Sequence, residues 1–317
     1  MKYIERTFKL EGAAGLGRYP NPEMIGPILT QLPQTLQDAV RMGFLHSSRP
    51  RGRVADALRA AAQVRFVGHS AAGSEGTLLT FQVPRLGEAA PTYFEQATFW
   101  DEGLREDATA FDLLGDALRD IREERVDSPH FDQPFLRGLS AYGKLMKRGV
   151  SRISLPEKTG RDTPAMDSTT LSVAERLALA TPPARRVRIA GRLDLMGASQ
   201  GVLKLHVRSG EIVTALWAGA ASIETHHELF NRDVVIEGLG VFRPSGSLLR
   251  VEADAIAAAT SQDEFFRHLP VAQPATWDPV GAARLRAGEP STYAAIRGAI
   301  PAEESDEDFA AAVDAFS

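Results

Sequence analysis

The spacing of apolar residues predicts a mixture of strands and helices in the first half of the chain. Residues 2–10 alternate as a strand does and end at a glycine-rich stretch. Helical spacing follows over residues 22–45, where Pro27 and Pro33 are expected to break the segment into pieces. Helices and strands mix here without the regular alternation of a parallel sheet. We therefore interpret residues 1–155 as one α+β domain.

The rest of this domain repeats the mixture. RVADALRAAA has helical spacing, and VRFVGH and TLLTFQV are two β-rich segments that flank SAAGSEG in a hairpin. The further expected elements are an amphipathic helix over Phe111, Leu114, Leu118 and Ile121, a helix over PFLRGLSAYGKLM, and a strand over VSRISLP. Residues 156–184 begin with the polar, turn-rich EKTGRDTPAMDSTT and are interpreted as a linker.

The clearest architecture lies over residues 185–258. Five strands with a short helix between the third and fourth are expected, which is the element order of an OB-fold barrel. Gly191 and Gly238 fall inside strands, where a small closed barrel needs sharp coiling or bulges. Another small antiparallel barrel or a sandwich is the alternative.

Strict alternation assigns the apolar residues of this barrel to one face of each strand. The expected inward sets are Val187, Ile189, Leu193 and Leu195, then Leu203, Leu205 and Val207, and finally Leu249, Val251, Ala253 and Ala255.

Composition narrows the classes of function. The chain has 317 residues, a net charge of -5 and no cysteine, so disulfides and thiolate metal sites are excluded. The negative balance provides no general attraction to nucleic acid or to an anionic membrane. The N-terminus lacks the apolar core of a signal peptide, and no long uncharged apolar run is present. We expect a cytoplasmic protein.

No sequence motif indicates a catalysed reaction. GHSAAG at residues 68–73 resembles a hydrolase nucleophile elbow, but its second glycine is one place late and a strand follows where a helix is required. His226 and His227 are adjacent, a spacing that rarely lets two imidazoles share one metal. We therefore expect no catalytic residue, no metal and no cofactor, with a hydrolase in the N-terminal domain as a remote alternative.

The barrel is a candidate for binding single-stranded nucleic acid. OB-folds hold single strands across their second and third strands with basic and aromatic side chains. The candidate residues are Lys204, His206, Arg208 and Trp217. Residues 185–258 contain nine Lys or Arg against eight Asp or Glu, so only segregation of charge onto one face would favour this function.

Residues 259–317 are interpreted as an extended partner-binding tail. Residues 298–317 contain six carboxylates and no Lys or Arg. Ser305 and the acids after it suit a helix N-terminus, and Phe309, Val313 and Phe316 follow at helical spacing. A helix this short is marginal alone in water, so it must pack on a surface, either of its own chain or of another.

The sequence YAAIRGAIPAEESDEDFAAAVDAFS, residues 293–317, resembles the C-terminal tail of small antitoxins that are paired with PIN-domain ribonuclease toxins. The order of a glycine, a proline, an acidic block with serine and a final apolar helix matches. Ile300 stands where those tails have tryptophan, and Ala302 where they have a second glycine. RLDLMGASQGVLKL and VFRPSGSLLRVEADAI also resemble a bacterial family that joins such a barrel to this kind of tail.

The resemblance implies a non-enzymatic protein that inhibits a partner nuclease. Tails of this kind wrap the toxin and place an arginine among the metal-binding carboxylates. The candidate partner-binding residues are Arg284, Arg286, Ile296, Arg297, Ile300, Phe309, Val313 and Phe316. The expected partner is a PIN-type ribonuclease, and the alternative function is single-strand binding by the barrel.

Overall fold

A computed structural model describes most of the chain up to residue 273. The described ranges are 2–12, 16–51, 54–73, 76–97, 104–155, 164–197, 201–219 and 223–273. They belong to one compact unit, residues 1–275. The predicted C-terminal helix and all eight partner-binding residues from Arg284 to Phe316 lie outside the described residues.

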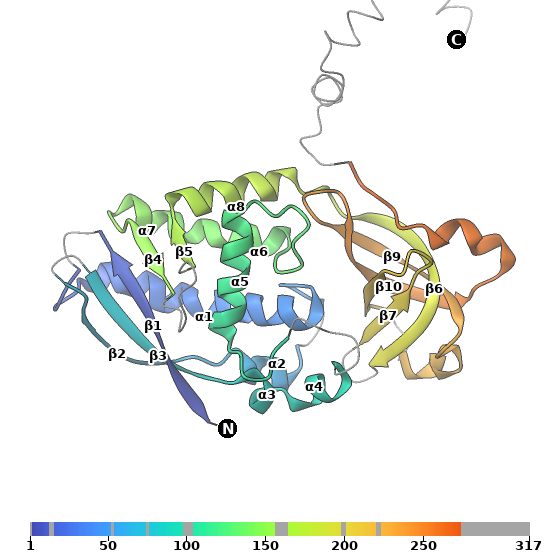
Figure 1. Cartoon of the computed structure of the whole chain (residues 1–317), viewed down its shortest axis with the longest axis horizontal. Coiled ribbons are helices and arrows are strands. Elements are labelled where there is room, and N and C mark those ends of the chain that lie inside the picture. The colour runs from blue at the N-terminus through green and yellow to red at the C-terminus, as the bar shows by residue number, and fades with distance from the viewer. Residues whose placement is uncertain are drawn as a thin grey trace, which may run out of the picture. The chain divides into compact units, whose positions relative to one another are not determined.

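An antiparallel sheet of five strands forms one side of the N-terminal lobe, a name we use for residues 2–181 (Figure 1). Its order is β2-β3-β1-β4-β5. The strands are β1 (Tyr3–Glu11), β2 (Arg65–Ala71), β3 (Gly76–Pro84), β4 (Arg152–Ser154) and β5 (Ala165–Asp167). The predicted first strand and the predicted pairing around SAAGSEG are confirmed, because β1 and β2 both pair antiparallel with β3.

The helices of this lobe pack against the sheet and against one another. They are α1 (Pro22–Leu45), α2 (Asp56–Ala61), α3 (Leu86–Ala89), α4 (Pro91–Ala97), α5 (Ala110–Arg122), α6 (Gln133–Leu139), α7 (Gly143–Lys147) and α8 (Ser168–Ala180). α1 packs against α5, and α6 packs against α8. The predicted helix at Phe111 is confirmed as α5, whose apolar side chains are buried.

The prediction that Pro27 and Pro33 divide the first helix is wrong. α1 is continuous over 24 residues, with the Asn21 side chain accepting from the Glu23 backbone N–H at its start and His46 in the left-handed region at its end. Each proline removes one backbone hydrogen bond. The buried stripe that includes Ile28, Leu32 and Leu36 outweighs that loss through packing.

Two other predicted elements differ in the structure. Residues 165–180 of the predicted linker form β5 and α8, and Val173, Ala174 and Leu177 of α8 are buried in the core. Some of the polar residues that suggested a linker form the N-terminal cap of this helix, because the Asp167 side chain accepts from the Thr170 backbone N–H. PFLRGLSAYGKLM forms α6, a 3-10 turn and α7 instead of one helix.

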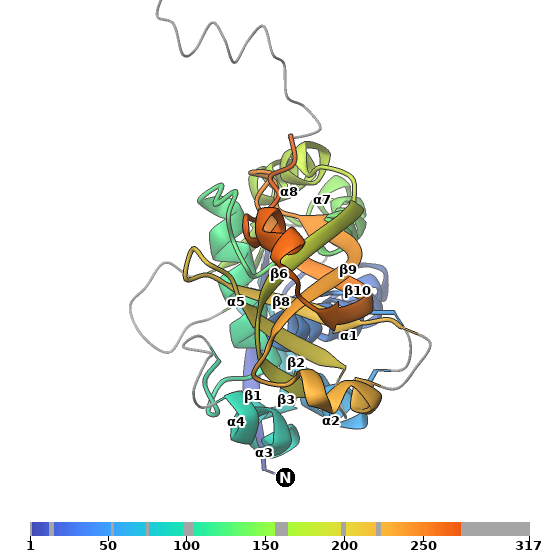
Figure 2. The same cartoon turned by 90° about the vertical axis from the view of Figure 1, so that its right-hand side faces the viewer.

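The second predicted region forms a closed barrel of five strands, which confirms the predicted strand count (Figure 2). The strands are β6 (Arg185–Gly197), β7 (Val202–His206), β8 (Ile212–Trp217), β9 (Asp233–Phe242) and β10 (Leu248–Ala258). Their closed order is β10-β8-β7-β6-β9, and only the β10–β8 pair is parallel. A 3-10 helix, Ile223–Leu229, lies between β8 and β9, and another, Ser261–Arg267, follows β10 and packs against β6.

Bulges change which residues face the barrel interior. Shifts of register occur between Leu193 and Leu195 on β6 and between Ala253 and Ala255 on β10. Leu195 consequently packs against the core of the N-terminal lobe, and Ala255 is exposed. Strict alternation was wrong for these two residues and for Leu249, which packs in the core of the N-terminal lobe beside a further shift of register between Leu248 and Arg250. An added residue in one strand moves the following side chain to the opposite face.

Glycine is required at the two strand positions that the sequence singled out. A Cβ at Gly191 would lie 2.6 Å from the carbonyl oxygen of His206, and one at Gly238 would lie 2.1 Å from that of Glu252. Both distances are shorter than any tolerable contact with a rigid backbone atom. The barrel therefore closes tightly at these points only because no side chain is present.

Candidate functional site

The outer side of the barrel is in large part an internal surface of the molecule. Val202 on β7 and Leu249 on β10 belong to the same buried apolar cluster as Leu32 and Leu58 of the N-terminal lobe. Leu216 on β8 is half-buried and packs against that cluster. The barrel interior forms a separate cluster around Leu203, Leu205 and Val251. The N-terminal lobe and the barrel thus share one apolar seam, formed by side chains that point out of the barrel.

A buried ion pair crosses this seam. The Arg250 guanidinium lies 3.2 Å from Asp132 Oδ2 through Nη1, which also donates to the carbonyl oxygen of His46 at 2.8 Å. Asp132 accepts from the Ser48 hydroxyl and backbone N–H, and it caps α6 at Phe135. The side chains of Arg250 and Asp132 are 4% and 0% exposed. Separating the two residues would leave an unpaired charge buried, which is costly. The ion pair therefore fixes the position of the barrel against the N-terminal lobe.

A second buried carboxylate lies on α1 near this ion pair. Asp38 accepts a 2.6 Å hydrogen bond from Gln34 Nε2, and Arg41 and Arg49 lie within 4 Å of its oxygens. Burial raises the pKa of Asp38, and the hydrogen bond and the two guanidiniums only partly oppose that effect.

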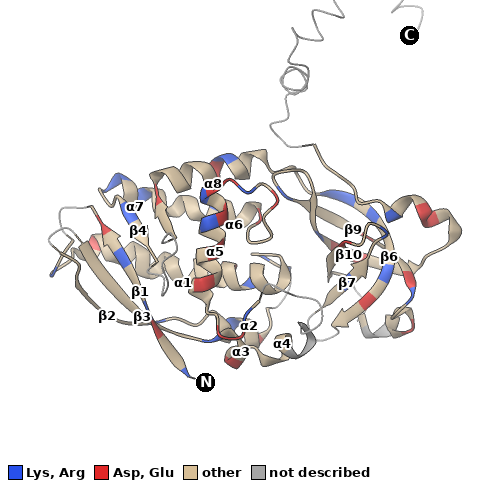
Figure 3. Cartoon of the chain, viewed as in Figure 1, with Lys and Arg blue, Asp and Glu red and all other residues tan. Residues whose placement is uncertain are grey.

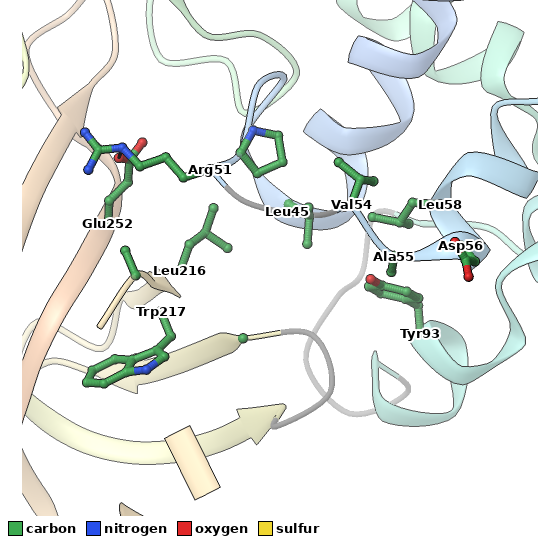
Figure 4. Close-up of a pocket in the computed structure, with 13 residues that line it drawn as sticks. Leu45, Arg51, Val54, Ala55, Asp56, Leu58, Tyr93, Leu216, Trp217 and Glu252 are labelled. Atoms are coloured by element: carbon green, nitrogen blue, oxygen red, sulfur yellow. Dashed lines mark ion pairs between the residues drawn. The ribbon is translucent and has the colours of Figure 1, made fainter. Parts of the chain in front are cut away.

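The seam also contains a pocket of about 300 Å³ (Figure 4), bordered by Glu252, which pairs with Arg250. The N-terminal lobe contributes the end of α1, the segment after it and α2, and the barrel contributes the end of β8 and part of β10. The residues that line the pocket include Leu45, Arg51, Ala55, Tyr93, Leu216 and Glu252. The wall combines aliphatic side chains with polar and charged groups, and Trp217 lies at the barrel side.

Arg51 and Glu252 form an ion pair at one end of this pocket, and Asp56 lies near Tyr93 at the other (Figure 4). Arg51 Nε lies 3.1 Å from Glu252 Oε2, and Arg250 Nη2 lies 3.4 Å from Glu252 Oε1. The Arg51 side chain is 69% exposed, whereas that of Glu252 is 12% exposed. Glu252 therefore bridges the buried ion pair and an arginine that faces solvent. The pKa of Tyr93, on the opposite wall, is raised by burial.

The sequence did not single out a carboxylate–imidazole pair between Asp120 on α5 and His130 on the loop before α6. His130 Nδ1 lies 2.7 Å from Asp120 Oδ2, and the Ser128 hydroxyl donates to the same oxygen at 2.6 Å. Burial acts to raise the pKa of Asp120, but these two contacts outweigh it, so the pKa lies below its usual range. The serine hydroxyl and the imidazole ring both contact the carboxylate, and the serine oxygen contacts His130 only at its backbone N–H, so the set does not form a nucleophile–base relay.

The four candidate nucleic-acid-binding residues are not brought together on an open face. Lys204 is only 7% exposed. His206 Nε2 lies 3.0 Å from Asp194 Oδ2, and Arg208 pairs with Glu264. Trp217 packs at the end of the barrel core and against the His226 ring. Figure 3 shows Lys and Arg interspersed with Asp and Glu over the barrel strands.

In the ranges that the structure describes, no group of three or more His, Asp or Glu side chains could hold a metal ion. No helix in those ranges is long and apolar enough to cross a membrane.

Comparisons of the chain with protein-family models, with curated proteins and with solved structures found no match.

Proposed function

We propose that this chain is a non-enzymatic regulatory protein whose C-terminal segment binds and inhibits a partner nuclease of the PIN type. The observation that carries the proposal is the sequence of residues 298–317, where six carboxylates without Lys or Arg are followed by an apolar stripe at helical spacing. The closed barrel supports it, because the bacterial family that this chain resembles joins a barrel to such a tail.

The mechanism rests on complementary charge and buried apolar area. PIN nucleases bind divalent metal among several carboxylates, so an arginine inserted there satisfies the acids in place of the metal. Arg297, Arg284 and Arg286 are the candidates for that role. Burying Phe309 and Phe316 on the partner would contribute ~1.5–3 kcal/mol for each ring. The acidic block would contact a basic rim of the nuclease.

The test uses the complex between the full chain and its nuclease, obtained by co-expression. The complex should not cleave labelled RNA in the presence of Mg²⁺, and a chain ending at residue 289 should neither co-purify with the nuclease nor inhibit it. Phe309→Asp with Phe316→Asp should act like the truncation. Ala311→Asp, which adds charge on the opposite side of the expected helix, serves as the matched control. Inhibition that survives the truncation would reject the tail mechanism.

The second candidate function is binding of single-stranded nucleic acid by the barrel. The strand order β10-β8-β7-β6-β9 with a parallel β10–β8 pair supports an OB-type assignment, because it combines a Greek-key order with closure. The burial of Lys204 and the ion pair of Arg208 speak against an open binding face. Fluorescence anisotropy of a labelled single strand tests this function. Loss of affinity in Arg208→Glu, with unchanged thermal unfolding, would favour it over inhibition by the tail.

A further inference from the structure

The pocket in the seam has the size and the walls of a small-molecule site. Its volume of about 300 Å³ corresponds to about ten non-hydrogen atoms at liquid density. Leu45 and Leu58 on one side and Leu216 on the other provide apolar contact, and Tyr93 adds an aromatic ring. Leu45, Leu58 and Tyr93 are buried, so a ligand would meet walls that the fold already holds in place.

The charged end of the pocket favours an anionic group. Glu252 already has a guanidinium at each oxygen, Arg250 at one and Arg51 at the other. Among the described residues, the single ion pair of Arg51 is made through Nε, so its two terminal amino groups remain as donors. A planar guanidinium with these donors free matches the two oxygens of a carboxylate. Asp56 also lines the pocket, but it is paired with Arg59.

We propose that the pocket binds a small organic monocarboxylate of about ten non-hydrogen atoms in all, most of them in an apolar body. The body lies between the leucines of the N-terminal lobe and Leu216, with Tyr93 at its side, and the carboxylate accepts from the terminal amino groups of Arg51. Because every residue involved lies within residues 45–252, this inference does not depend on the proposed function of the tail.

Three probes with the same phenylpropyl body test the charge preference: hydrocinnamate, its neutral amide and the corresponding amine. Titration calorimetry on the full chain gives each affinity. The fluorescence of Trp217 in a Trp100→Phe/Trp277→Phe chain reports binding at the pocket itself. Hydrocinnamate should bind about tenfold more tightly than the amide, and the amine should bind most weakly, because one charge-assisted contact is made only by the acid.

Substitutions locate the site. Arg51→Gln should remove the preference for acid over amide without abolishing binding of the amide, because Arg51 is exposed and holds only the charged end. Arg105→Gln, an equally exposed arginine paired with Asp107, is the control for net charge and should leave the preference unchanged. Ala55→Phe should fill the pocket and abolish binding of all three probes, while circular dichroism and thermal unfolding confirm that the variant is folded.

Three results would overturn the proposal. One is the absence of binding of hydrocinnamate at millimolar concentration to the unmodified chain. Another is equal affinity for the acid, the amide and the amine. The last is binding that persists in folded Ala55→Phe, since the ligand would then occupy a different place.

Discussion

The seam between the N-terminal lobe and the barrel has two charged parts, one enclosed and one open to solvent. Strand β10 contributes one residue to each part, Arg250 to the enclosed part and Glu252 to the open part. The two lie two positions apart on the outer side of the barrel. Arg250 is enclosed with Asp132, Ser48 and a backbone carbonyl, whereas Glu252 borders a pocket whose arginine, Arg51, faces solvent. The enclosed part fixes the geometry of the strand, and the open part leaves donors for a ligand. One element thus joins a structural contact to a candidate binding site.

The largest expected effect comes from breaking the enclosed ion pair. Asp132→Ala should lower the free energy of unfolding by about 3–5 kcal/mol, because it leaves Arg250 buried without its carboxylate and removes the cap of α6. Urea unfolding measures the loss, and exposed Asp107→Ala is the control. The double variant Asp132→Leu/Arg250→Met should recover part of the loss. A loss below about 1 kcal/mol for Asp132→Ala would mean that the seam does not depend on this pair.

The next effect acts on β9, which pairs with the strand that carries both parts. Gly238→Ala should destabilise the protein by about 1–3 kcal/mol, because its Cβ would lie 2.1 Å from the Glu252 carbonyl oxygen and push β9 from β10. Gly68→Ala on β2, where a Cβ meets nothing within 4 Å, is the matched control. Urea unfolding measures both stabilities. Equal free energies of unfolding for the two variants would show that the barrel accommodates a Cβ at Gly238 with little cost.

The pH dependence should distinguish two buried carboxylates near the seam. The lowered pKa of Asp120, beside His130 and Arg125, means that its stabilising contribution is present above about pH 4 and is lost as the pH falls through the lower folded pKa. The raised pKa of Asp38 has the opposite sign, so its ionised form destabilises the fold and stability is gained as the pH falls through that raised value.

Urea unfolding between neutral pH and pH 3 checks this contrast. Asp120→Asn should be destabilised by about 1–3 kcal/mol at neutral pH and should approach the unmodified chain in acid. Asp38→Asn, which mimics the protonated form, should be at least as stable as the unmodified chain at neutral pH, should lack the gain in mild acid and should approach the unmodified chain there. Parallel curves for the two variants would contradict the assignment of opposite shifts.

The smallest expected effect belongs to the open part of the seam. Arg51→Gln should change the free energy of unfolding by less than about 0.5 kcal/mol, because an ion pair made by a solvent-exposed arginine contributes little. Thermal unfolding measures this value. A loss as large as that of Asp132→Ala would show that Arg51 is part of the structural contact and not free for a ligand.

The sequence predicted the local elements well where apolar periodicity was strong. The stripe of α5 and the five strands of the barrel were recognisable, and Gly191 and Gly238 stood where closure needs them. The continuity of α1 was missed because proline was judged by its local effect, while burial of Ile28 and Leu32 decides the helix. α8 was missed because its polar cap resembled a linker. The proposed function of the tail stays a prediction.

What the chain alone determined is therefore local: which segments are strands or helices, and which glycines a closed barrel requires. Tertiary structure decided the rest, because bulges at Leu195 and Ala255 reset the faces of strands, and because contacts between residues far apart in sequence set burial. Lys204 was a candidate for an open binding face, yet it is only 7% exposed. Arg250 is enclosed against the N-terminal lobe, where it donates to the carbonyl oxygen of His46. Arg51 and Glu252, about two hundred positions apart, meet only because the two parts pack together.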